Sequence, residues 1–83
     1  MKRASISQTV DLLNELKQEA PMTTNLSRFF NDRGQDSCLG PIVKGIGLVE
    51  KTGRTYRWTG DKVNNNLARL IRDTANLYKN YAE

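Results

Sequence analysis

The spacing of apolar and polar positions predicts a helix at the start of the chain. Its apolar residues recur at steps of three or four and so share one face, and they are Ile6, Val10, Leu13, Leu16 and Ala20. Ser5 is the expected N-cap, and Pro21 ends the helix because proline disfavours helical geometry in the residue before it. Asp11, Glu15 and Glu19 are each four residues apart, which predicts an acidic stripe, either a solvated face or a partner-binding one, that points away from any nucleic acid.

A second, shorter helix is predicted to follow. It begins at Thr23 or Thr24 as the cap and continues to about Arg33. Its apolar face has the spacing i, i+3, i+4 and consists of Leu26, Phe29 and Phe30. Gly34 fits the left-handed position just past the end of a helix.

The same spacing predicts a third helix, whose apolar residues are Leu39, Ile42, Val43 and Ile46. Its start is open: Asp36 or Ser37 can begin it, but Pro41 is tolerated only in a first turn and moves the start towards Gly40. Gly47 closes this helix.

After residue 47 the pattern changes to one of strands. Residues 48–51 and 54–58 flank a two-residue connection at 52–53 whose second residue is glycine, which predicts a tight β-hairpin. Tyr56 and Trp58 are two residues apart and therefore share one face of the second strand. We expect this aromatic pair to cover the helices.

A long helix over residues 61–82 completes the pattern. Its apolar residues repeat at steps of four and three, and two more widen the stripe; together they are Val63, Leu67, Leu70, Ile71, Thr74, Leu77, Tyr78 and Tyr81. A helix of some twenty residues spans roughly 30 Å, which a three-helix core is too short to cover. This helix can either fold back on its own domain or pair with the same helix of a second copy. Because of its length, we predict a homodimer, with these eight residues at the interface between the two copies.

The order of helix, helix, helix, hairpin and helix resembles a winged helix-turn-helix domain. The most specific stretch is residues 42–51, Ile-Val-Lys-Gly-Ile-Gly-Leu-Val-Glu-Lys, which is similar to the family pattern in which the recognition helix ends at a Gly-Leu-aliphatic step into the wing. The resemblance covers residues 6–59 of a chain that we interpret as one domain, 1–83. It implies a mainly α fold with a three-helix core, a β-hairpin wing and the long C-terminal helix in addition. It also implies that the third helix enters the major groove of double-stranded DNA, while the hairpin contacts an adjacent groove or the phosphates.

The charge distribution agrees with a polyanionic partner. The net charge is +4, and the segment between Thr23 and Gly60 contains six basic residues and only three acidic ones. The candidate DNA contacts are Lys44, Lys51, Arg54 and Arg57, followed by Arg28, Arg33 and Ser37. The third helix offers few of the side chains that hydrogen-bond to base edges, so either specificity is low or the fold has another purpose. We therefore keep two hypotheses: a DNA-binding, transcription-regulator-like homodimer, or a non-catalytic module that binds another protein.

Other functions are disfavoured by what the chain lacks. It has no histidine and one cysteine, Cys38, so a Cys/His zinc site or an internal disulfide cannot be built. The carboxylates are scattered, without the apolar pairing that general acid–base catalysis needs. No apolar run approaches the ~18 residues of a membrane span, and residues 1–5 lack the apolar segment of a signal peptide. We expect a cytoplasmic protein that is not an enzyme and has no cofactor, metal or membrane partner.

Overall fold

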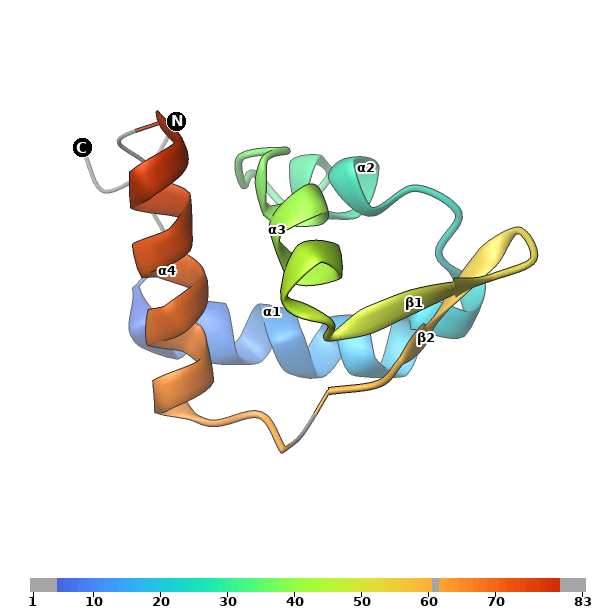
Figure 1. Cartoon of the computed structure of the whole chain (residues 1–83), viewed down its shortest axis with the longest axis horizontal. Coiled ribbons are helices and arrows are strands. Elements are labelled where there is room, and N and C mark those ends of the chain that lie inside the picture. Colours follow the sequence, from blue (N-terminus) through green and yellow to red (C-terminus); the bar gives the residue numbers. More distant parts are fainter. Residues whose placement is uncertain (1–4, 61, 80–83) are drawn as a thin grey trace.

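A computed structural model describes residues 5–60 and 62–79, apart from the side chain of Lys79, and shows a mainly α chain with one small β-hairpin. The elements in order are α1 (Ile6–Glu19), the 3-10 turn η1 (Ala20–Met22), α2 (Leu26–Asn31), α3 (Leu39–Ile46), β1 (Val49–Thr52), β2 (Thr55–Trp58) and α4 (Asn65–Lys79). Helix α1 lies along the base of the molecule with α2 and α3 above it, α4 crosses one end, and the hairpin extends from the other side (Figure 1). The predicted fold class, helices plus a small hairpin and a C-terminal helix, is confirmed.

Helix α1 begins as the sequence predicts. The Ser5 hydroxyl accepts a hydrogen bond from the Gln8 backbone N–H at 3.1 Å, and the Gln8 side chain accepts one from the Ser5 N–H at 2.8 Å. This capping box satisfies two N–H groups that a helix start leaves without partners. The α-helix ends at Glu19, and Pro21 lies in the 3-10 turn that follows. The buried side of α1 includes Leu13 and Leu16, which are 1% and 0% exposed.

Helix α2 starts later than predicted, because its cap is Asn25 and neither Thr23 nor Thr24. The Asn25 side chain accepts a hydrogen bond from the Arg28 backbone N–H at 3.1 Å. Thr23 is extended instead, with ψ 124°, and its hydroxyl donates to the Glu19 carbonyl at 2.7 Å. Thr23 is the C-cap of η1, and η1 packs beside β2. Because Thr23 is extended there, the cap of the next helix lies two residues later, at Asn25.

Helix α3 begins at Leu39, between the two starts that the sequence leaves open. The Asp36 carboxylate accepts a hydrogen bond from the Cys38 N–H at 2.8 Å and holds the preceding residues in a turn. Gly47 ends the helix in the left-handed conformation, with φ 94°, as predicted. Gly40 is buried against α2: a Cβ atom there would lie 2.7 Å from the Ser27 backbone nitrogen, so only glycine allows the two helices to approach this closely.

The hairpin is shifted by one residue from the prediction. Thr52 pairs with Thr55, so the connection is Gly53–Arg54, and glycine is its first residue, with φ 67°. Tyr56 is buried and Trp58 is half-buried against the hydrophobic core, which confirms that this aromatic pair covers the helices.

Helix α4 begins at Asn65, four residues later than predicted, because the Asn64 side chain accepts a hydrogen bond from the Leu67 backbone N–H at 2.9 Å and caps the helix there. The predicted helix positions 61 and 80–82 lie outside the described residues. Helix α4 packs against α1 and α3. The side chains that are at most 1% exposed include Ala68, Ile71 and Ala75 of this helix.

Candidate nucleic-acid interface

The six basic residues between Thr23 and Gly60 fall into two groups in the structure. Arg28, Arg33 and Arg57 form ion pairs with carboxylates of the chain. Lys44, Lys51 and Arg54 are exposed, and within residues 5–60 and 62–79 no hydrogen bond or ion pair engages their side chains. The sequence places Arg57 in the first rank of candidate contacts with Lys44, Lys51 and Arg54, and only the fold separates it from them by its ion pair.

Arg33 is the most firmly held of these cations. Its Nε lies 2.9 Å from Glu15 Oε1 in an ion pair that lacks hydrogen-bond geometry, and its Nη2 donates to Glu19 Oε2 at 3.0 Å. Its Nη1 donates to the Phe29 carbonyl at 2.8 Å, and the guanidinium carbon lies 3.7 Å from the centre of the Phe29 ring. With its side chain 24% exposed, Arg33 fastens the end of α2 to α1. A phosphate could therefore bind Arg33 only by displacing Glu15 and Glu19.

The acidic stripe of α1 thus has a partner inside its own chain. Glu15 and Glu19 were predicted to form a solvated or partner-binding face, and they bind Arg33 instead. Sequence reasoning missed this pairing because Glu19 and Arg33 are 14 residues apart, beyond the range of any helical spacing rule. The signals in the sequence were two acids at a spacing of four and an arginine at the end of a predicted helix, and neither identifies the other as its partner.

The two exposed ion pairs are weaker. Arg57 and Glu50 are directly opposite in the hairpin and pair on its outer face. Arg28 Nε lies 3.7 Å from Asp32 Oδ2 on α2, with 79% and 61% of the two side chains exposed. Exposed pairs of this kind contribute about 0–1 kcal/mol each, so a phosphate can compete for either arginine.

The hairpin does not present its three cations together. Lys51 is directly opposite Tyr56, and the side chains of such a pair lie on the same face, which is the one towards the core. Arg57 lies on the other face. Arg54 is in the turn between the strands. Lys51, Arg54 and Arg57 therefore lie on one face of the hairpin, in its turn and on the opposite face, respectively.

The exposed surface of α3 is small and contains little chemistry. Of its eight residues, Pro41, Lys44 and Gly45 are exposed, and Ser37 is exposed just before the helix. Nothing lies within 4 Å of the position that a Cβ atom on Gly45 would take. Helix α3 contacts β1, to which Gly47 and Leu48 connect it, so Lys44 and the hairpin cations come from adjoining elements.

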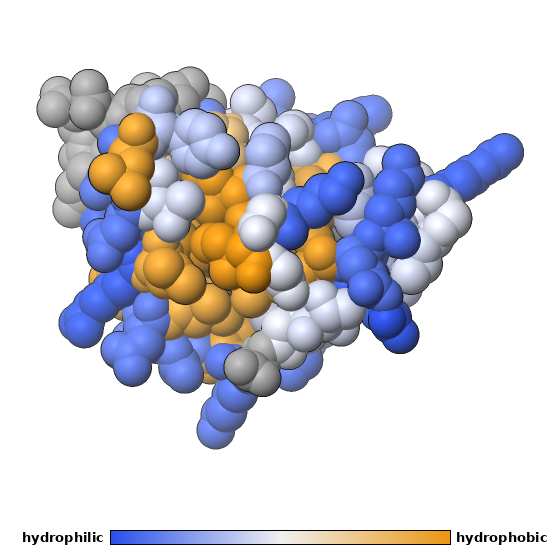
Figure 2. Space-filling view, in the orientation of Figure 1, coloured by the Kyte–Doolittle hydropathy of each residue, from blue (hydrophilic) through white to orange (hydrophobic). Residues whose placement is uncertain are grey.

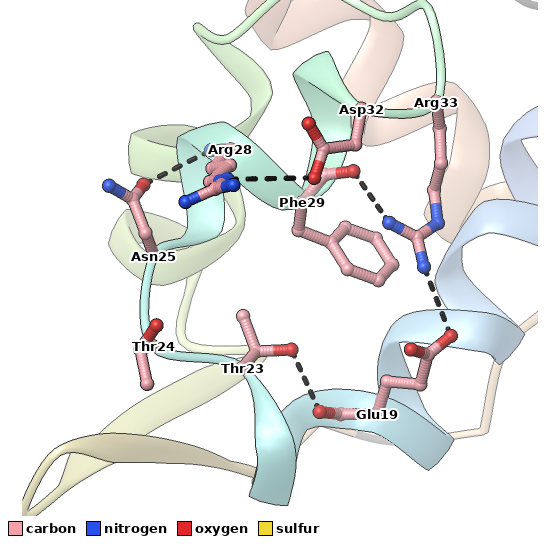
Figure 3. A pocket seen from close by; sticks show the side chains of 8 residues that line it. All are labelled: Glu19, Thr23, Thr24, Asn25, Arg28, Phe29, Asp32 and Arg33. Carbon is pink, nitrogen blue, oxygen red and sulfur yellow. Dashed lines mark hydrogen bonds and ion pairs between the residues drawn. The ribbon is translucent and has the colours of Figure 1, made fainter.

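An open pocket of about 330 Å³ lies beside α2 (Figure 3), and its lining residues are Glu19, Thr23, Thr24, Asn25, Arg28, Phe29, Asp32 and Arg33. Figure 3 shows that the polar groups point at one another: Arg33 at Glu19, Arg28 at Asp32, and the Thr23 hydroxyl at the Glu19 carbonyl. The lining holds two carboxylates and two guanidinium groups, so it offers no surplus charge to a phosphate.

The predicted dimer residues are divided by the fold. Ile71 is 1% exposed within its own chain, and Val63 and Leu67 are partly buried against the core. Leu70, Leu77 and Tyr78 are 48%, 89% and 70% exposed. Thr74 is half-buried, and its hydroxyl donates to the Leu70 carbonyl at 2.8 Å. Tyr81 lies outside the described residues.

The inward face of α4 is instead made of Ala68, Ile71 and Ala75. These residues recur at the helical steps of three and four. The stripe predicted from the sequence was based on larger side chains, so it included Ile71 but neither alanine. Small residues let α4 lie close to α1 and α3, so among the described residues of the predicted stripe Ile71 is the one large side chain that is fully buried.

Apolar surface gathers between α3 and α4 on the face shown in Figure 2. An open groove of about 440 Å³ lies there, and its apolar lining is Ile46, Leu48, Leu67 and Leu70. Lys62 and the Asn64 and Asn66 side chains border it. The groove and the exposed residues Leu70, Leu77 and Tyr78 give this side of α4 a mainly apolar surface.

Two further findings concern other chemistry. Within the described part of the chain, no group of three or more His, Cys, Asp or Glu side chains could hold a metal ion. None of the helices formed by the described residues has the length and apolar content needed to cross a membrane.

Comparison of the chain with protein-family models, curated proteins and solved structures finds no match. The function is therefore argued from the residues and their geometry.

Proposed function

We propose that the chain is a small DNA-binding protein of winged-helix type, with α3 and the hairpin facing the duplex. The observation that carries the proposal is the separation of the cations: Lys44, Lys51 and Arg54 are exposed and unpaired among the described residues, on α3 and on the adjoining hairpin. Unpaired cations on neighbouring elements attract a polyanion, because contact with phosphates releases counterions from the DNA.

The packing of the helices supports this orientation. Helices α2 and α3 touch through their backbones at Gly40, and Gly47 turns the chain from α3 directly into the hairpin. Such an arrangement presents the exposed side of α3 beside the hairpin, as the resemblance to winged helix-turn-helix domains implies. Lys44 and Ser37 would meet the duplex from α3, while Lys51 and Arg54 would contact phosphates. Arg28 and Arg57 can join only by leaving Asp32 and Glu50.

The test is a titration of a labelled duplex, followed by fluorescence anisotropy at several salt concentrations. The informative variant is Arg54→Gln, and its matched control is Arg69→Gln, because Arg69 is exposed on α4, which is not one of the elements proposed to face the duplex. We expect Arg54→Gln to weaken binding and to reduce the magnitude of the slope of log K against log salt by about 0.9 per chain, which is about 1.8 for a dimer, while the control leaves both unchanged. No binding at tens of micromolar in low salt would refute the function.

We also propose that the protein acts as a homodimer in the cytoplasm, with the second copy seated on the exposed apolar side of α4. Leu70, Leu77 and Tyr78 form this side together with the groove beside α3. Monomers rarely leave a contiguous apolar patch of this kind open to water. A two-fold axis through α4 would bring the two hairpins into one complex.

The oligomeric state tests this second step. Leu70→Asp combined with Leu77→Asp places two charges on the exposed stripe without touching a fully buried side chain. The control is Arg69→Glu, which changes the net charge by the same amount on the same helix. Sedimentation should give twice the 9.4 kDa of one chain for the unchanged protein and the control, and the single mass for the double variant. A double variant that still dimerises would refute this interface.

The groove between α3 and α4 also favours a second candidate function, that of a non-catalytic protein-interaction module. Its lining of Ile46, Leu48, Leu67 and Leu70 is apolar and partly open to solvent. The module predicts no DNA affinity and full dependence on the apolar stripe of α4. The anisotropy titration and the sedimentation experiment together distinguish the two candidates.

A further inference from the structure

The side of α3 that would face a duplex has almost nothing with which to distinguish bases. Bases are distinguished in the major groove by hydrogen bonds from Arg, Lys, Asn and Gln side chains. The exposed positions of α3 are Pro41, Lys44 and Gly45, preceded by Ser37. The proline ring has no donor or acceptor, and glycine has no side chain. Only Lys44 and Ser37 can hydrogen-bond to a base from this helix.

The elements next to α3 contribute few further side chains that could hydrogen-bond to bases. The Asn25 carbonyl oxygen is used by the Arg28 N–H as the cap of α2, and Gln35 is half-buried in the loop before α3 with an interaction of its own. In the hairpin, Arg54 is the one guanidinium without a partner among the described residues. An arginine in a turn can enter a minor groove, where A·T and T·A present the same acceptors, so it discriminates poorly.

We infer that this chain binds duplex DNA through the phosphate backbone, with little or no preference for base sequence. The inference rests on the proposed DNA-binding function and specifies its ligand as the duplex itself rather than a particular site. The charges carry it: three unpaired cations, Lys44, Lys51 and Arg54, lie on α3 and the hairpin, and of these only Lys44, together with the Ser37 hydroxyl, belongs to α3 or the residues just before it. Phosphate contacts fix a protein on DNA but contain no sequence information directly.

The inference gives a quantitative expectation. Three phosphate contacts per chain correspond to a fall of log K with log salt whose slope has a magnitude of about 2.7, or about 5.4 for a dimer. The affinities for unrelated duplexes of equal length should agree within about threefold, whereas site-specific proteins prefer their sites by about 10³-fold or more.

The experiment is a selection from a random duplex library, followed by titration of the most enriched duplex and of an unrelated one. Binding to both within about threefold, without an enriched motif, is the expected result. An enriched motif that binds more than about tenfold better than the unrelated duplex would overturn the inference and leave the DNA-binding function standing. No binding to any duplex in low salt would instead overturn the function.

A matched pair of variants tests the role of Lys44. Lys44→Gln removes the charge of the one long side chain that α3 presents, and Lys17→Gln removes an equal charge from an exposed position on α1. We expect Lys44→Gln to weaken binding to every duplex by the same factor and to reduce the magnitude of the salt slope by about 0.9 per chain, which is about 1.8 for a dimer, with no effect of the control. A loss confined to particular sequences would show that Lys44 contacts bases, and no loss would remove it from the interface; either result contradicts the inference.

Discussion

The close contact between α2 and α3 can be tested by adding a single methyl group. In Gly40→Ala, the new Cβ atom would lie 2.7 Å from the Ser27 nitrogen and 3.0 Å from both the Leu26 carbonyl carbon and the Ser27 Cα. All three are backbone atoms, which cannot move aside by changing a rotamer, so the two helices must separate. Overpacking of this kind costs about 1–3 kcal/mol. Alanine returns at most about 1 kcal/mol through its higher helix propensity. We expect a net loss of up to about 2 kcal/mol in the free energy of unfolding.

The same helix supplies the control. Gly45→Ala is an identical chemical change, but nothing lies within 4 Å of the new methyl group. Here only the helix propensity acts, and we expect a gain of up to about 1 kcal/mol. Urea unfolding followed by circular dichroism measures both variants against the unchanged protein. In thermal unfolding, each 1 kcal/mol corresponds to a shift of roughly 4–8 °C for a domain of this size. A Gly40→Ala protein as stable as Gly45→Ala would refute the backbone contact.

Three further stability predictions can be checked by the same unfolding measurements. Ser5→Ala removes the capping box and should cost about 0.5–2 kcal/mol, whereas Ser7→Ala on the exposed side of α1 should cost less than about 0.5 kcal/mol; equal losses would contradict the cap. Gly47→Ala forces a side chain into φ 94° and should cost about 1–2 kcal/mol, with Gly47→Asn losing less, because asparagine tolerates this region better. Arg33→Gln breaks the link to Glu19 and the contact with Phe29 and should cost about 1 kcal/mol, a loss that high salt reduces; an unchanged stability would mean that this link does not hold α2 to α1.

Local sequence signals predicted the structure correctly where it depends on one residue and its nearest neighbours. Ser5 caps α1, and Gly34 and Gly47 take left-handed conformations at the ends of their segments, as predicted. These features depend on the backbone geometry of one residue and its nearest neighbours, which the residue type constrains strongly.

The same kind of signal failed where neighbouring residues had similar propensities. Thr23, Thr24 and Asn25 are all good N-caps, and Asn25 is used because Thr23 must remain extended where η1 packs beside β2. The hairpin connection is Gly53–Arg54 rather than residues 52–53, because the strand register is fixed by which side chains are buried, and Tyr56 is among them.

The sequence by itself determined the kinds of element, their order and the apolar side of most of them, since helix and strand periodicities act over a few residues. Only the tertiary structure decided which cations stay free. Glu19 and Arg33 are 14 residues apart and meet because α2 folds back over α1, whereas Lys44, Lys51 and Arg54 find no acid within reach among the described residues. It also decided which side of α4 is inside, since Ala68 and Ala75 let the helix lie close to the core and leave Leu77 in water. An apolar or charged pattern indicates what kind of environment a side chain favours, but which residue becomes its partner depends on distances in the folded chain.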